Sequence, residues 1–116
     1  MMRIFIGVAL FVGAAALLLS QNSAFTGEIM DSQCAGMHSH SKMMEGVNAK
    51  DAKDCTEKCV HQLGGKYALF DPSTNTAYQL DNQEKAAAFA GQKVSVKGTL
   101  DQGSKTIHLE SISPGN

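Results

Sequence analysis

An uninterrupted apolar run near the N-terminus sets how much of the chain is left to fold. After Arg3, sixteen consecutive residues (4–19) are apolar or glycine, and small polar residues follow at 20–24. This layout is typical of a secretory signal peptide over residues 1–24, cleaved after Ala24. A retained membrane anchor is the alternative, but the run is shorter than the roughly 20 residues that span a bilayer. We therefore expect a periplasmic or secreted protein whose mature domain has no stable membrane insertion.

The remaining chain is short for a domain stabilised by its hydrophobic core alone. Removal of the first 24 of 116 residues leaves 92, which predicts a single domain over residues 25–116. A domain of this size buries only roughly 60–65% of its unfolded surface, and this one contains no tryptophan. Small cores of this kind often depend on a disulfide or a metal ion. In an oxidising compartment, the three cysteines are candidates for either role.

Charge and motifs exclude several function classes. Ten Lys and Arg residues stand against eleven Asp and Glu, a net charge of −1. Because nucleic-acid binding needs a basic surplus, no nucleic-acid partner is expected. The sequence has no nucleophile elbow, phosphate loop or metalloprotease helix. The C-x3-C spacing of Cys55 and Cys59 also differs from the C-x-x-C of dithiol oxidoreductases. The chain is therefore not expected to be an enzyme.

Hydrophobic periodicity predicts five strands and two helices. Alternation indicates strands over residues 25–30, 66–70, 77–80, 93–100 and 106–110, and Gly98 suggests a bulge in the fourth. Residues 51–63 predict a helix with positions 52, 55, 59, 60 and 63 on one apolar face. A shorter helix is expected from Asp81, as N-cap with Glu84 completing a capping box, to Ala90. Residues 31–50 show no period and are expected to form a loop.

This element order predicts the fold class. A mainly β, five-stranded barrel of OB type carries a helix between its third and fourth strands, as here. Its unusual part is an insertion over residues 31–65, a loop and helix that carry every cysteine. Another small α+β sandwich is the alternative, because element order does not determine strand pairing.

Three motifs resemble an uncharacterised family of small secreted bacterial proteins. They are G-x-I-x-D-S-x-C at residues 27–34, C-x3-C-V at 55–60 and K-V-x-V-x-G-T-L at 93–100. The resemblance runs over roughly residues 26–113, and the C-terminal half is also similar in pattern to periplasmic OB-fold proteins. It implies export and a shared OB-like fold, and it carries over no catalytic residues.

The cysteine spacing limits which disulfide can form. Cys55 and Cys59, four residues apart on a helix, have Cβ atoms about 5–6 Å apart. A disulfide needs about 3.5–4.5 Å, so an intrahelical bond would distort the helix. The disulfide candidates are therefore Cys34 with Cys55 or Cys34 with Cys59. Either would close a loop of roughly 20–25 residues and contribute about 3 kcal/mol.

A metal site is the competing interpretation. Residues 34–44 hold six soft or borderline ligands, namely Cys34, Met37, His38, His40, Met43 and Met44. Thiolate and thioether select Cu(I), imidazole suits copper or zinc, and three thiolates with one His complete a tetrahedral zinc site. The candidate metal ligands are Cys34, His38, His40, Cys55 and Cys59. His61 and His108 are expected to face water, on a helix and an outer strand face respectively.

Two functions follow from these alternatives. The first is an exported small binding domain that holds copper or zinc through the Cys, His and Met cluster. The second is a disulfide-stabilised structural module, or one that binds a ligand or protein, with no metal and no other cofactor.

Overall fold

The computed structural model describes residues 23–115 and is mainly β. The signal peptide proposed for residues 1–24 lies outside these residues, apart from Ser23 and Ala24, and stays a prediction. Among residues 23–115, no helix is both long and apolar enough to cross a membrane. The strands are β1 (Ser23–Asp31), β2 (Tyr67–Asp71), β3 (Thr76–Leu80), β4 (Lys93–Asp101) and β5 (Thr106–Pro114).

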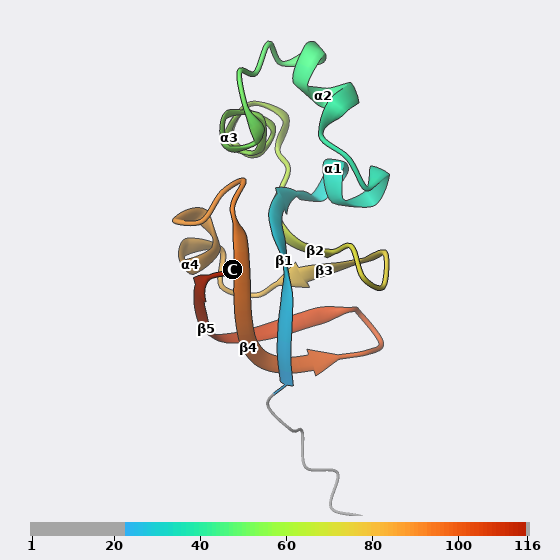
Figure 1. The fold of residues 1–116 in the computed structure, drawn as a ribbon, viewed down its shortest axis with the longest axis vertical. Coiled ribbons are helices and arrows are strands. Elements are labelled where there is room, and N and C mark those ends of the chain that lie inside the picture. Colours follow the sequence, from blue (N-terminus) through green and yellow to red (C-terminus); the bar gives the residue numbers. More distant parts are fainter. Residues whose placement is uncertain (1–22, 116) are drawn as a thin grey trace, which may run out of the picture.

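The five strands form one sheet that closes on itself in the order β1-β2-β3-β5-β4 (Figure 1). Strand β1 closes the ring by pairing antiparallel with β2 at its C-terminal end and with β4 along its N-terminal part. Strands β2 and β3 form a hairpin, as do β4 and β5. The contact between β3 and β5 is parallel and short, with two residue pairs at Gln79 and Leu80. The predicted five-stranded, mainly β architecture is thus confirmed.

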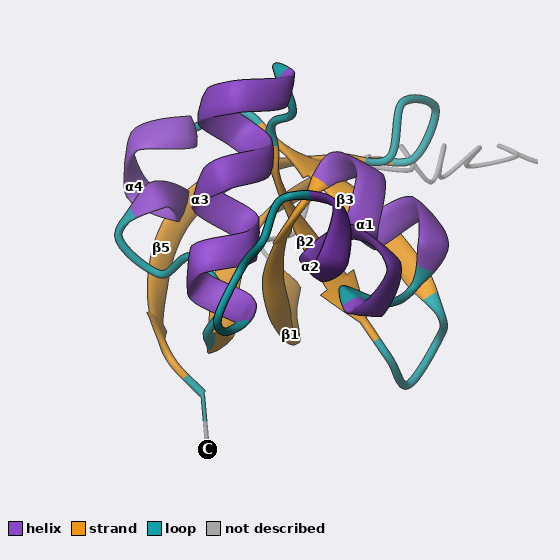
Figure 2. Cartoon of the chain, turned by 90° about the horizontal axis from the view of Figure 1, so that it is seen from above, coloured by secondary structure: helices purple, strands orange, loops and turns teal. Residues whose placement is uncertain are grey.

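Within residues 23–115, four helices accompany the sheet. Helices α1 (Ser32–Met37), α2 (Ser41–Gly46) and α3 (Ala52–Leu63) lie together over one end of the sheet, between β1 and β2 in the chain (Figures 1 and 2). Helix α4 (Gln83–Ala87) lies between β3 and β4 in the chain, and Ala86 is buried in the interior. The loop predicted for residues 31–50 was wrong, because α1 and α2 occupy most of it.

Two helix details also differ from expectation. Helix α4 begins after Asn82, whose side chain accepts the Lys85 N–H, so the predicted capping role of Asp81 was wrong. Asp81 instead accepts the backbone N–H of Leu109 at 2.7 Å, joining the start of α4 to β5. Leu63 was predicted on the buried face of α3, but it is 47% exposed at the last turn of that helix.

Two apolar clusters lie on opposite sides of β1 and β2. Ile29 and Leu69 point into the ring, where they pack with residues of the other strands and α4. Met30, Ala68 and Phe70 point the other way, into a cluster shared with the three cysteines. Because successive strand residues face opposite sides, both faces of these strand ends are buried. This arrangement explains why β2 is a nearly continuous apolar run.

The bulge predicted at Gly98 is present. The β4–β5 register shifts between Lys97 and Gly98, where β4 bends around the ring. A Cβ at Gly98 would overlap the His108 carbonyl oxygen and would lie 2.8 Å from Cγ2 of Ile107. The bend therefore requires a residue without a side chain.

Substitution of Gly98 should test this close approach. We expect Gly98→Ala to lower the free energy of unfolding by about 1–3 kcal/mol, because the methyl group overpacks the strand pair. Gly46→Ala is the matched control, since a Cβ there meets nothing within 4 Å and the position is helical. The control should change stability by no more than about 1 kcal/mol, in the favourable direction. Urea unfolding measures both, and equal stability of the two variants would contradict the argument.

Candidate metal centre

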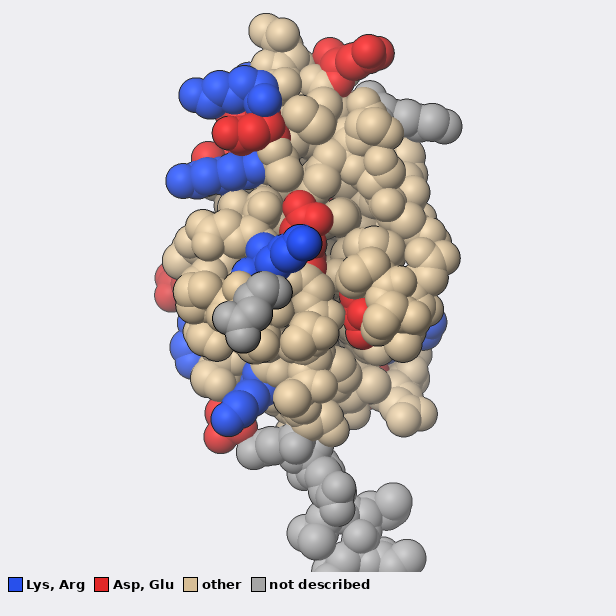
Figure 3. Space-filling model, in the orientation of Figure 1, with Lys and Arg blue, Asp and Glu red and all other residues tan. Residues whose placement is uncertain are grey.

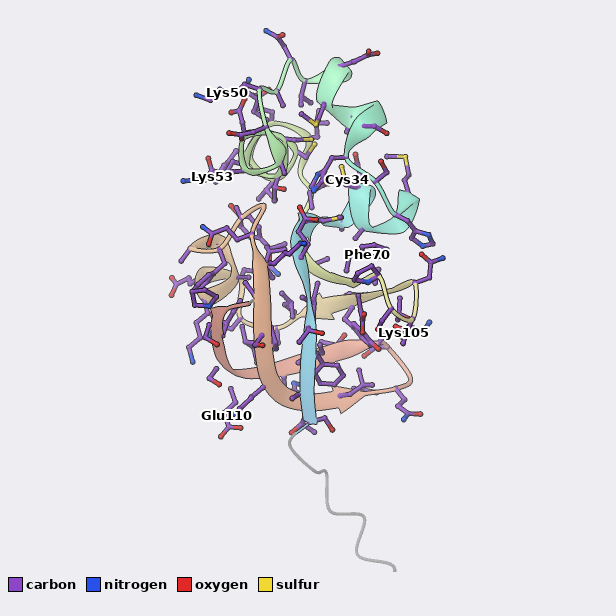
Figure 4. The ribbon with its side chains drawn as sticks, in the orientation of Figure 1. Cys34, Lys50, Lys53, Phe70, Lys105 and Glu110 are labelled. Atoms are coloured by element: carbon purple, nitrogen blue, oxygen red, sulfur yellow. The ribbon has the colours of Figure 1, made fainter. Side chains whose placement is uncertain are left out.

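The three cysteines meet in the layer between the sheet and the helices. Cys34, on α1, and Cys55 and Cys59, on α3, are completely buried and carry free thiols. Their sulfur atoms all lie within 4.8 Å of one another. Figure 4 places Cys34 just beyond the end of β1, between α1 and α3, with Phe70 below it on β2.

Local capping interactions place Cys34. Asp31, the last residue of β1, is the N-cap of α1 and is completely buried. Its Oδ1 accepts the Cys34 N–H and its Oδ2 accepts the Gln33 N–H, both at 3.0 Å. Because these two donors belong to the first helical turn, the carboxylate turns the chain from strand to helix. Asp31 at an N-cap position was the sequence signal for α1 that the periodicity analysis missed.

Helix α3 presents the other two thiols on successive turns. It begins at the N-cap Asp51, which accepts the Asp54 N–H at 2.8 Å, and ends at Gly64, whose φ is +71°. Cys55 and Cys59 are buried one turn apart, as the sequence predicted. The residue after the cap, Gly65, donates its N–H to the Cys59 carbonyl at 3.1 Å. A Cβ at Gly65 would lie 2.9 Å from Oδ2 of Asp31, so the missing side chain lets the end of α3 approach that carboxylate.

The surroundings favour protonated thiols. Burial, and then the hydrogen bond and charge of Asp31, raise the pKa of the Cys34 thiol far above its ordinary value. Burial, followed by the charge of Asp31, raises the pKa of Cys59 to about 11. Low-dielectric surroundings disfavour the thiolate, so without a metal ion these thiols are weak nucleophiles at neutral pH.

The predicted histidine ligands, His38 and His40, lie outside the group of three cysteines. Among the described residues, the acidic, His and Cys side chains close enough to share an ion are the three cysteines alone. The ring of His38 is exposed and stacks on Phe70, with centroids 5.2 Å apart. The ring of His40 is 12% exposed, and its Nε2 lies 2.9 Å from Oε1 of Glu28.

The remaining methionine and histidine side chains divide between the cysteine cluster and the surface. Met43 and Met44 pack against the cysteine cluster from α2, whereas Met37 is 43% exposed. His61 is exposed on α3, as predicted. His108 is also exposed, and its Nδ1 lies 3.1 Å from Oδ2 of Asp81.

A groove of about 410 Å³ runs along the outer face of β1 next to the cluster. Met30 and Phe70 line this groove and also belong to the buried cysteine cluster, so the two share a wall. Glu28 and His38 are also among its lining residues. On the face in Figure 3, acidic and basic side chains are interspersed and much of the surface is uncharged. The groove therefore lies against one side of the cysteine cluster without reaching the sulfurs.

Comparison with known proteins gives a family match over part of the chain. Residues 59–115 match a family described as a protein of unknown function (DUF5818), which supports an uncharacterised family. The match covers Cys59 and strands β2 to β5, and it leaves Cys34 and Cys55 outside. No curated protein and no solved structure matches the chain.

The raised thiol pKa values predict a pH-dependent stability of the reduced, metal-free protein. Unfolded thiols ionise near 9.0, whereas folded Cys59 keeps its proton to about 11. Because the folded state binds this proton more tightly, its stabilising effect is complete below pH 9 and is lost as the pH rises towards about 11. Urea unfolding under reductant between neutral pH and pH 11 should show the decline. Cys59→Ala should decline less steeply, and identical pH profiles would contradict the assignment.

Proposed function

We propose that this chain is an exported domain that binds one thiophilic metal ion, Cu(I) or Zn(II), through Cys34, Cys55 and Cys59. The observation that carries the proposal is the group of three buried sulfurs within 4.8 Å of one another. Three sulfurs bound to one ion at about 2.3 Å lie roughly 4 Å apart. Binding therefore requires side-chain shifts of about 1 Å, without rearrangement of the helices.

The chemistry of the pocket supports a thiophilic ion. Thiolates select Cu(I), zinc and other soft or borderline metals, whereas calcium and magnesium need oxygen ligands. The apolar side chains around the sulfurs, such as Met30, Ala68 and Phe70, shield them from water. Because the free thiols are protonated, binding releases protons and tightens as the pH rises towards the thiol pKa values.

The same sulfurs also permit the disulfide that the sequence left open. A bond between Cys34 and Cys55, or between Cys34 and Cys59, would consume two of the three ligands. The metal-bound and disulfide states therefore exclude each other. Thiol counting on protein purified without reductant distinguishes them, because a disulfide leaves one reactive thiol in the denatured chain.

We also infer that the closed sheet is an OB-type barrel and that the chain is exported. The strand order β1-β2-β3-β5-β4, with α4 between β3 and β4, supports the first inference. The apolar run at residues 4–19 supports the second.

Metal binding is tested by titrating the reduced protein with Zn(II) and Cu(I) in the presence of competing chelators. The wild type should bind one equivalent, and Cys55→Ser and Cys59→Ser should each weaken binding by more than about 100-fold, beyond the roughly 10–100-fold cost of losing an outer partner. His61→Ala is the control, since His61 is exposed on the same helix. Equal, weak binding of Zn(II) and Cu(I) by the wild type and the cysteine variants would contradict the proposed metal site.

Export is tested separately by fractionation and intact mass. The mature protein should appear in the periplasm or medium with residues 1–24 removed. Cleavage after Ala24 would remove two residues that pair with Lys97 and Gly98 at the start of β1, and the pairing from Phe25 onward would remain. Recovery of the full-length chain only in the membrane fraction would favour the anchor instead.

A further inference from the structure

Three sulfurs leave a tetrahedral zinc ion one ligand short, and a histidine next to the cluster has an unused nitrogen. Structural zinc is almost always four-coordinate, and three cysteines with one histidine form a recurrent ligand set. The imidazole of His40 is 12% exposed, and its buried Nδ1 has no hydrogen-bond partner among the described residues. A buried polar atom without a partner destabilises the folded state, so it calls for an explanation.

The other ring nitrogen establishes which atom is free to bind. His40 Nε2 lies 2.9 Å from Oε1 of Glu28, which is 25% exposed on β1. Because a carboxylate only accepts hydrogen bonds, Nε2 carries the hydrogen, and in the neutral imidazole Nδ1 then holds a lone pair. A carboxylate that accepts the N–H opposite the metal-binding nitrogen is the usual partner of a histidine ligand, since it fixes the tautomer and the ring orientation.

The local structure places His40 on the face of α2 whose residues contact the cysteine cluster. Residues three and four apart on a helix share a face, and His40 has helical φ and ψ angles at the start of α2. Met43 and Met44, three and four residues later, pack against the cysteine cluster. Helix α2 is also linked to the turn that carries Cys34, because the Ser39 N–H donates to the Cys34 carbonyl at 3.1 Å.

Glu28, the partner of His40, lies on the same side of the sheet as the cysteine cluster. Glu28 and Met30 are two residues apart on β1 and so face the same way, and Met30 belongs to the cysteine cluster. His40 is therefore held between the start of α2 and β1, on the side of the sheet that carries the cysteine cluster. Its nitrogen lies outside the group of mutually close ligand atoms, so coordination requires the ring and the first turn of α2 to move towards them.

We propose that Nδ1 of His40 is the fourth ligand, so that the centre is a Cys3His zinc site with Glu28 as the carboxylate that orients the histidine. This inference rests on the proposed metal-binding function and adds the identity of the ion. Cu(I) is satisfied by the soft thiolates alone. Zn(II) is the ion that gains from the imidazole, so His40 should contribute to zinc affinity and not to Cu(I) affinity.

The direct test follows the histidine rings of the reduced, full-length mature protein by two-bond ¹H–¹⁵N NMR. Addition of one equivalent of Zn(II) should shift the Nδ1 resonance of His40 to that of a metal-bound nitrogen, while Nε2 keeps its hydrogen. The His38 ring, exposed and stacked on Phe70, should keep both of its resonances. This measurement uses the wild-type chain, so it does not depend on the folding of any variant.

Variants give the second test. His40→Ala should weaken zinc binding by more than about 100-fold and Glu28→Gln by roughly 10–100-fold, as expected for an outer partner. Both should leave Cu(I) affinity within a few-fold of wild type, and the matched control His38→Ala should change neither. With Co(II) as the probe, His40→Ala should alter the visible d–d bands and retain the sulfur-to-metal charge-transfer bands of three thiolates.

The outcomes separate this inference from the function on which it rests. Zinc binding that needs the cysteines but leaves the His40 resonances unchanged would overturn the role of His40 and retain the three-sulfur site. Equal losses of zinc and Cu(I) affinity in His40→Ala would assign His40 a structural role instead. Binding of Cu(I) without zinc by the wild type would overturn the Cys3His zinc site alone, and absence of both zinc and Cu(I) binding would overturn both proposals.

Discussion

The helical layer depends on one buried carboxylate at the end of β1. Asp31 is completely buried, and it accepts the N–H groups of Gln33 and Cys34 through separate oxygens. A buried charge is costly unless it is hydrogen-bonded, so these contacts determine where the chain leaves the strand and enters α1. The end of α3 reaches the same carboxylate because Gly65 has no side chain. Two segments more than thirty residues apart in the chain thus converge on one side chain, and the sulfurs converge with them.

That carboxylate also sets the chemical character of the cysteines. Reactive cysteines in proteins lie near positive charge and water, where the thiolate is stabilised. Here burial and the nearby negative charge of Asp31 act in the opposite direction, and raise the pKa of the Cys34 and Cys59 thiols. A metal ion supplies the positive charge that the protein itself does not place there. The arrangement therefore suits tight holding of an ion better than nucleophilic chemistry on a substrate.

The elements predictable from sequence were those in which one physical signal dominates. The alternation around Val94 and Val96 and the glycine at position 98 identify β4 and its bulge, and the spacing of Cys55 and Cys59 with Gly64 behind them identifies α3. Helices α1 and α2 were missed because six residues are too few to show a helical period, and their stability comes from packing and from the Asp31 cap. The convergence of the sulfurs, and the contact of His40 with Glu28 twelve residues away, are tertiary and leave no local pattern.

The alternation of β1 has a consequence for how separable the two halves of the molecule are. Ile29 belongs to the interior of the ring and its neighbour Met30 to the cysteine cluster, so the two cores share a wall one strand thick. A register shift of β1 by one residue would place each of these side chains on the opposite face and disrupt the packing of both cores. Excision of the inserted segment would likewise leave Met30, Ala68 and Phe70 facing water. The insertion is therefore not a detachable loop on a finished scaffold, because the same stretch of β1 and β2 forms one wall of each core.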